Sequence, residues 1–299
     1  MDFPTALGAI AGVFLDASLE IVPFFLLAIL FGAVIEEFVS EGTITRFLTG
    51  RHPATMLLAS TTGALIPLCT CGMVPLAVAL RRRGSDMKHT FAFLTAGAAV
   101  SVPVLGLTWK VLGFEWMAAR LLTSVIFGLL VGYGAIGVLR HAAERSAEPA
   151  KAPPIAPVAP IPRPRAVSVL RRFWGQVMEY LPWVIVSLAL AAVVDVMVPR
   201  HWIHVLYGQK TALGSLLASL TGLPFYFCSG AELPLVQQLL AKGMGTGPGI
   251  AMLLAVPIVN ILTFGVVARW IGPRGAFGYL ALCVAGATGI GAVYGAFLP

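Results

Sequence analysis

The stretch Pro67-Leu68-Cys69-Thr70-Cys71-Gly72-Met73-Val74-Pro75 interrupts a long apolar segment of this chain. Proline removes a backbone donor and glycine frees the backbone, so a helix is expected to break here. A related stretch in the second half reads Pro224-Phe225-Tyr226-Phe227-Cys228-Ser229-Gly230-Ala231-Glu232-Leu233-Pro234. Unpaired backbone at membrane depth is tolerated only where it is buried in protein or lines a cavity. Two such interrupted segments in matching halves indicate a substrate site between them.

The composition is that of a membrane protein. The chain has 299 residues, of which 58% are hydrophobic and 11% charged, whereas a soluble domain carries about 25% charged residues. Apolar runs of about 20 residues recur along the whole length, which predicts an all-α polytopic membrane protein. The lysines and arginines that make the net charge +7 lie mostly in short loops and one linker, which is typical of membrane topology and predicts no nucleic-acid partner.

The chain contains two matching sets of four apolar segments. A constant offset of 159 residues relates Glu20 to Glu179, Cys69 to Cys228, Pro75 to Pro234, Gly113 to Gly272 and Ser101 to Asn260. Between the two sets, residues 149–164 contain seven prolines, which is typical of a semi-rigid linker outside the bilayer. We therefore expect a first membrane repeat over 1–140, a proline-rich cytoplasmic linker over 141–167 and a second membrane repeat over 168–299.

The motif segments leave two topologies open. About 13 apolar residues precede Pro67 and about five follow Pro75, and neither piece spans roughly 30 Å at 1.5 Å per residue. A re-entrant hairpin gives three crossings per half, hence inverted repeats, with 15 basic residues inside and four outside. A broken but complete crossing gives eight spans, with 12 inside and seven outside. The positive-inside rule favours the inverted arrangement, with both termini outside and the linker inside.

Sulfur atoms are the first candidates for substrate contact. In an unwound stretch the thiols of Cys69 and Cys71 can face one cavity, and pseudo-symmetry would add Cys228 and leave Met73 nearby. Soft sulfur donors select thiophilic species such as Cu(I), so these three cysteines are also candidate metal ligands. The alternative is that they are small packing residues, which is the interpretation we prefer for Cys283.

Ionisable and polar residues inside the apolar segments are the next candidates. Carboxylates within membrane segments are costly, so Glu20 and Glu179 are predicted to couple transport to an ion such as the proton. Glu232 lies inside the second motif and is a predicted substrate-binding residue. Ser101, Asn260 and Tyr226 are predicted to line the cavity, although interhelical hydrogen bonding is the interpretation we prefer for the first two. Arg120 is expected to extend to the membrane interface.

The first motif, continued by Leu76 and by Arg81-Arg82-Arg83-Gly84, resembles the hallmark of the ArsP-like predicted permeases. In that family a Pro-x-Cys-x-Cys-Gly-x-x-Pro-Leu segment marks one half and a degenerate copy marks the other, as Cys228 to Pro234 resembles here. The resemblance extends from about Glu20 to Gly291 and makes Cys69 and Cys71 the matching cysteines. It further implies backbone roles for the prolines and glycines of both motifs: Pro67, Gly72, Pro75, Pro224, Gly230 and Pro234.

The sequence therefore predicts a permease of the bacterial inner membrane that exports a thiophilic small substrate and needs no cofactor. Some members of the family are similar to efflux permeases for trivalent organoarsenicals, which we take as the first substrate class. Others are similar to copper and zinc efflux transporters, which are the alternative. A membrane thiol-redox enzyme using Cys69 and Cys71 is the alternative of another class, and the sequence contains no quinone or cofactor site that would favour it.

Overall fold

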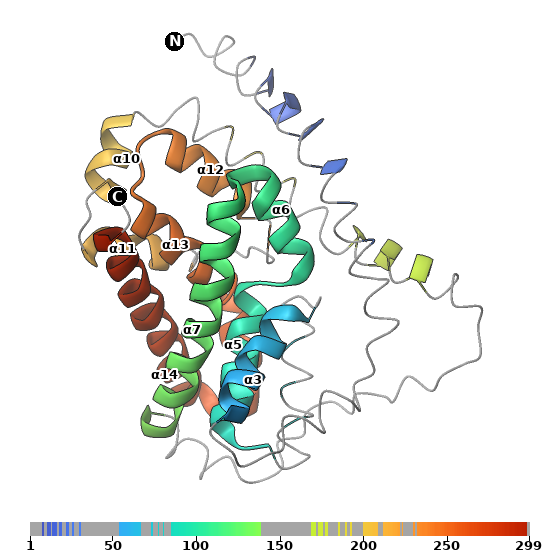
Figure 1. Cartoon of the computed structure of the whole chain (residues 1–299), viewed down its shortest axis with the longest axis vertical. Helices are drawn as coiled ribbons and strands as arrows, with labels where there is room; N and C mark the ends of the chain where they lie inside the picture. The colour runs from blue at the N-terminus through green and yellow to red at the C-terminus, as the bar shows by residue number, and fades with distance from the viewer. Residues whose placement is uncertain are drawn as a thin grey trace.

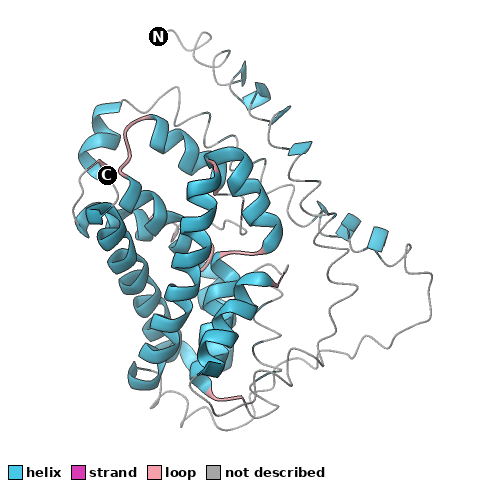
Figure 2. Ribbon diagram, in the orientation of Figure 1, coloured by secondary structure: helices cyan, strands magenta, loops and turns pink. Residues whose placement is uncertain are grey.

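The computed structural model describes residues 54–66, 85–138, 200–208, 212–221 and 232–297, together with isolated positions between and before these ranges. All regular structure in the described residues is helical, and the connections are short loops (Figure 2). The helices are α3 (Ala54–Leu65), α5 (Met87–Ala99), α6 (Val102–Leu112), α7 (Phe114–Val138), α10 (Arg200–Tyr207), α11 (Ala212–Leu220), α12 (Leu233–Ala241), α13 (Thr246–Ala255) and α14 (Ile261–Phe297).

Three described stretches are long and apolar enough to cross a membrane. They cover residues 87–112, 114–138 and 271–297, with mean hydropathies of 1.8, 2.1 and 1.7. The outer faces of α7 and α14 expose large apolar side chains such as Leu122 and Phe277, as lipid-facing helices do. The prediction of an all-α membrane protein is confirmed at this level.

The first of these stretches is not one continuous helix. The sequence indicated a single apolar segment from about His89 to Thr108, but α5 ends at Ala99 and the backbone is extended at Val100 and Ser101. Pro103 explains the interruption, since its ring would clash with the carbonyl of Ala99, four residues earlier, and it has no N–H to donate to that oxygen. The predicted apolar segment is therefore present as one membrane-length stretch, and two helices form it.

A second interruption separates α13 from α14, where the sequence also indicated one segment, from about Gly249 to Ala268. The side chain of Asn260 makes hydrogen bonds on both sides of this interruption. Its Oδ1 accepts a hydrogen bond from the backbone N–H of Thr263 at 2.8 Å, and its Nδ2 donates to the carbonyl of Pro257 at 3.1 Å. Asparagine is a favoured N-cap because this oxygen satisfies a donor at the start of the helix.

Two glycines act as elbows between helices. Gly113 (φ 97°) joins α6 to α7, and Gly272 (φ 79°) divides α14 into two parts, with Pro273 starting the second part. These dihedrals lie in the left-handed region, which glycine adopts without steric cost. Each elbow lets a short interrupted helix pass directly into a long membrane-crossing one (Figure 1).

In the first bundle, α3 and α5 run parallel to each other and antiparallel to α7 (Figure 1). Their directions follow from close contacts. The Thr55 hydroxyl lies 2.8 Å from Nε2 of His89, near the start of both α3 and α5, and Gly63 lies against the backbone of Phe93 further along both helices. The Ser60 hydroxyl donates to the carbonyl of Val125 at 2.7 Å across α3 and α7.

The second bundle is formed by α11, α13 and α14. The close approach of Gly247 to Gly291 and Gly295 brings the start of α13 to the end of α14, so these two helices are antiparallel. The Thr288 hydroxyl donates to that of Ser219 at 3.4 Å, which joins α14 to α11. The bundles meet where α7 packs against α14, with Gly134 beside Leu282 and Gly286 beside Phe127.

Candidate functional site

The candidate site is formed where the second motif segment meets the first bundle. Gly230 has a φ of 98°, and the Glu232 side chain folds back so that its Oε2 accepts a hydrogen bond from the Gly230 N–H at 2.8 Å. A Cβ at Gly230 would lie 3.1 Å from a methyl group of Val104 on α6. A side chain at this position would therefore be both strained and crowded, which explains the glycine.

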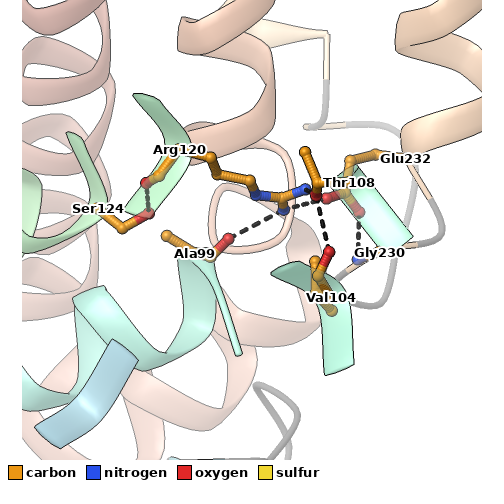
Figure 3. A network of polar contacts seen from close by, with 7 residues as sticks. All are labelled: Ala99, Val104, Thr108, Arg120, Ser124, Gly230 and Glu232. Atoms are coloured by element: carbon orange, nitrogen blue, oxygen red, sulfur yellow. Dashed lines mark hydrogen bonds and ion pairs between the residues drawn. The ribbon is translucent and has the colours of Figure 1, made fainter. Parts of the chain in front are cut away.

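Arg120 of α7 is the partner of Glu232. Its Nη2 donates to Oε1 of Glu232 at 2.5 Å and to the carbonyl of Ala99 at 3.0 Å, while its Nη1 donates to the Thr108 hydroxyl at 3.2 Å (Figure 3). Arg120 and Glu232 are both 0% exposed. The expectation that Arg120 extends to the interface was wrong: a carboxylate, a carbonyl and a hydroxyl hold its guanidinium inside the protein.

The interruption at Ser101 creates one of these acceptors. Because Pro103 cannot donate to the carbonyl of Ala99, this oxygen lacks its usual helical partner, and Arg120 donates in its place. A cation at the carboxyl end of a helix is also favoured by the helix dipole. The Thr108 hydroxyl donates to the carbonyl of Val104 at 2.7 Å, which leaves its oxygen lone pairs to accept from Arg120.

The ion pair is costly to form and costly to break. Moving two charges out of water carries a penalty of several kcal/mol per ion, which mutual attraction offsets only when the geometry is good. Removing one partner of such a buried pair typically costs about 3–5 kcal/mol. Charged residues inside membrane segments are candidates for substrate and ion pathways by default, so this pair is the strongest candidate site among the described residues.

The described residues include four more of the sequence-predicted positions. Met73 is fully buried, and a methyl group at Gly97 of α5 would overlap its terminal methyl. Ser101 and Asn260 are both buried and both lie at helix interruptions. The Asn260 side chain caps α14, whereas the Ser101 hydroxyl makes no capping bond. Pro234 is buried in the first turn of α12, where proline is favoured.

The remaining predicted residues lie outside the described part of the chain. They are Cys69, Cys71, Cys228, Glu20, Glu179, Tyr226, Pro67, Gly72, Pro75 and Pro224. Within the described residues, no group of three or more His, Cys, Asp or Glu side chains could hold a metal ion. Cys283 is fully buried in α14.

The sequence contains a pattern that favours a buried, paired Arg120, which the expectation of an interfacial side chain did not take into account. The residue lies about 9 Å into an apolar helix of 25 residues, and Glu232 lacks a carboxylate counterpart in the first half, where Met73 stands. An unmatched cation and an unmatched anion in two apolar segments are a reason to expect a pair.

Interrupted helices, a charge pair at their junction and membrane-length apolar helices are features expected of a membrane transport protein. Comparison with known families identifies which one. Residues 6–296 match the model of the ArsP_1 predicted permeases, and the chain belongs to this family. The prediction from the motifs is thereby confirmed.

Similar proteins occur in distant organisms. UPF0718 protein MJ0584 of Methanocaldococcus jannaschii is 22% identical over 91% of this chain and 91% of its own length. UPF0718 protein YraQ of Escherichia coli is 26% identical over 79% of this chain and 66% of its own length. No solved structure matches the chain. Membership of a permease family indicates a transporter rather than an enzyme.

Proposed function

We propose that this permease exports trivalent organoarsenicals across the inner membrane of a bacterium-like cell. The observation that carries the proposal is the Arg120–Glu232 pair, which joins the second motif segment to the first bundle. A buried charge pair at the contact of two broken segments is expected where a transporter binds its substrate. The sulfur atoms of both motif segments supply the preference for a thiophilic substrate.

Three close contacts support the interpretation that the chain is a duplication. A Cβ at Gly132 would lie 2.7 Å from the Lys88 carbonyl, 2.8 Å from Ala92 and 2.9 Å from Met56. Gly291 occupies the position equivalent to Gly132. A Cβ at Gly291 would lie 2.7 Å from the Gly247 carbonyl, 2.7 Å from Ala251 and 3.0 Å from Ser215, which are the equivalents of Lys88, Ala92 and Met56. The matching contacts at Gly132 and Gly291 support the membrane repeats proposed over 1–140 and 168–299.

The helix directions support inverted repeats. The long helices α7 and α14 of the two bundles pack antiparallel, since Gly134 lies beside Leu282 while Gly286 lies beside Phe127. Because each long helix is also antiparallel to the two shorter helices of its own bundle, the bundles have opposite orientations. Opposite orientations of two homologous halves are the arrangement of inverted-repeat transporters.

Isolated described positions in the first motif region favour the re-entrant hairpin over a full crossing. Met73 packs at Gly97, near the end of α5, whereas the carbonyl of Leu80 accepts a bond from the N–H of Ser85 at 3.1 Å, just before α5 begins. Because α3 runs parallel to α5, the start of α5 at Ser85 lies on the same side of the protein as the start of α3, whereas Met73 lies near the far end of α5. The positions of Met73 and Ser85 therefore favour a chain that turns back between α3 and α5. A hairpin of this kind in each half corresponds to three crossings per half, the arrangement that the distribution of basic residues favours.

Sulfur donors are proposed as the part of the site that selects the substrate. Met73 supplies a buried thioether next to α5, and we place the thiols of Cys69, Cys71 and Cys228 around the same cavity. Trivalent arsenic and soft metal ions share an affinity for such ligands, whereas Mg²⁺ prefers oxygen. An organic substituent on arsenic would also suit the aromatic residues Phe225, Tyr226 and Phe227 of the second motif.

Resistance of a sensitive bacterial host tests this function. Cells expressing the wild-type protein are expected to grow at concentrations of phenylarsine oxide or methylarsenite that stop the empty-vector strain. Cys69→Ser and Cys71→Ser are each expected to remove this resistance, because serine keeps the size and loses the soft donor. The matched control is Cys283→Ser, which changes the same atom in α14 and is expected to leave resistance unchanged. Resistance to copper or zinc but not to the arsenicals would overturn the proposed substrate in favour of a soft metal.

A further inference from the structure

Arg120 and Glu232 differ in the hydrogen bonds that each would keep if the ion pair between them opened. Apart from each other, Arg120 retains the carbonyl of Ala99 and the hydroxyl of Thr108, both in the first bundle. Among the described residues, Glu232 retains the N–H of Gly230, which belongs to its own turn. If the second motif segment moves away from α6 and α7, Arg120 stays partly compensated while Glu232 loses the counter-charge that Arg120 provides.

A bare carboxylate in the protein interior is far more costly than a neutral carboxylic acid, so a buried carboxyl group without a cation takes up a proton. Arginine has no equivalent response, because its guanidinium is not deprotonated in proteins. We therefore infer that Glu232 is a proton carrier of the transport cycle, binding one proton from water each time its pair with Arg120 opens and releasing it when the pair re-forms.

The surroundings of the pair contain no second group that would take over this role among the described residues. On α6 and α7 and directly after α12, the other charged side chains are Lys110, Glu115 and Lys242, all at least partly exposed. Asp16 and Arg171, in described positions of segments that pack against the neighbouring apolar cluster, are exposed. Lys88 and His89 lie at the opposite end of α5, about 15 Å along the helix from Ala99. Helices α12 and α13 carry no charged residue within their bounds.

This inference rests on the proposed export function and specifies how it is driven. A neutral substrate leaves the cell while one proton enters on Glu232, with no change of oxidation state and no bond made or broken other than the O–H bond. Glu20 and Glu179 remain candidates for ion coupling, and Glu232 adds a carboxylate whose counter-charge is known.

The first test is transport in proteoliposomes with phenylarsine oxide as the probe. Glu232→Gln keeps the shape and the acceptor for Gly230 but cannot exchange a proton. It is expected to lose accumulation driven by a pH gradient, whereas exchange of the probe across the membrane without a gradient becomes slower but stays measurable. Glu115→Gln is the matched control and is expected to retain both activities. Gradient-driven accumulation at the wild-type level in Glu232→Gln would overturn the inference, and loss of both activities in folded protein would make the residue structural.

The second test needs no substrate, so it separates this inference from the proposed function. Infrared difference spectra at neutral pH are compared for purified Arg120→Met and for the double variant Arg120→Met/Glu232→Gln. The single variant is expected to show the C=O band of a protonated carboxyl group, and the double variant to lack it, because Glu232 without Arg120 binds a proton. The same band difference is expected to be absent between the wild type and Glu232→Gln. Identical carboxyl bands in the single and double variants would overturn the inference, whereas failure of the wild type to move phenylarsine oxide would overturn only the proposed substrate.

Discussion

The hydroxyl of Tyr279 lies 3.2 Å from the hydroxyl of Thr95, and this hydrogen bond joins α14 to α5 across the two bundles. Tyr279 occupies the position 159 residues after Arg120. Both side chains are fully buried, and each reaches from the long helix of one half of the chain to a residue of the other half. The two equivalent positions thus bind the bundles together with different chemistry, a neutral bond in one case and an ion pair in the other.

Tyr279→Phe should remove this bond and leave the Thr95 hydroxyl without its tyrosine partner, at a cost of about 1–3 kcal/mol. The ring itself should remain packed against Phe91, whose centroid is 5.0 Å away. Thermal unfolding of the purified protein in detergent is the measurement, with Tyr133→Phe on the exposed face of α7 as the control. Equal melting temperatures for the two variants would contradict the role given to this bond.

The close contact at Gly291 predicts a sharp difference between two glycines of α14. Gly291 lies against the backbone of Gly247, whereas a Cβ at Gly289 would meet no described atom within 4 Å. Gly291→Ala should separate α13 from α14 and destabilise the protein by about 1–3 kcal/mol. Gly289→Ala should be neutral or stabilising, because alanine is the better helix former by about 1 kcal/mol. Thermal unfolding compares the two variants, and a tolerated alanine at Gly291 would contradict the packing.

The two single variants of the ion pair should differ in stability. Glu232→Gln leaves a permanent buried cation and should approach the loss of about 3–5 kcal/mol expected for a broken buried pair. Arg120→Met should cost less, because Glu232 can bind a proton and become neutral. The double variant should recover part of the loss, since a neutral pair removes both desolvation penalties. A double-mutant cycle on thermal unfolding measures all three values, and additive losses would rule out coupling between the residues.

The inverted arrangement predicts where the loops lie. A reporter fused at residue 155, in the proline-rich linker, should be cytoplasmic, and one fused at the carboxyl terminus should be outside the membrane. The distribution of basic residues and the antiparallel packing of α7 and α14 both lead to this result. Finding both reporters on one side would favour eight full crossings instead.

Glu20 and Glu179 should also affect coupling. Glutamine at either position is expected to reduce accumulation driven by a pH gradient and to leave the protein folded, because a carboxylate held within a membrane segment serves as an ion site by default. Vesicle transport under an imposed pH gradient is the measurement. Wild-type transport by both variants would assign these residues a structural role and leave Glu232 as the carboxylate that couples.

The sequence predicted the class, the helical membrane fold and the family, because long apolar runs and a specific motif around Cys69 and Cys71 carry that information. It did not predict the interruptions at Ser101 and before Asn260, since hydropathy is insensitive to a proline that begins a new helix within an apolar run. It also placed Arg120 at the membrane interface, whereas the side chain is buried. The partner of Arg120 is 112 residues away, and no local pattern connects an arginine on one helix with a glutamate in a turn of the other half.

That separation has a consequence for biosynthesis. When α7 enters the membrane from the ribosome, Glu232 has not yet been translated, so Arg120 is inserted with no carboxylate to neutralise it. On translocon scales an arginine at the centre of a helix costs about 2.5–3.5 kcal/mol, and Arg120, nearer the start of α7, costs no more than this, which the apolar remainder of α7 can offset. The amino-terminal half is therefore insertable but electrostatically incomplete until the second motif arrives. A nascent chain stalled between the halves should be a substrate for membrane quality control, and co-expression of the missing half should protect it.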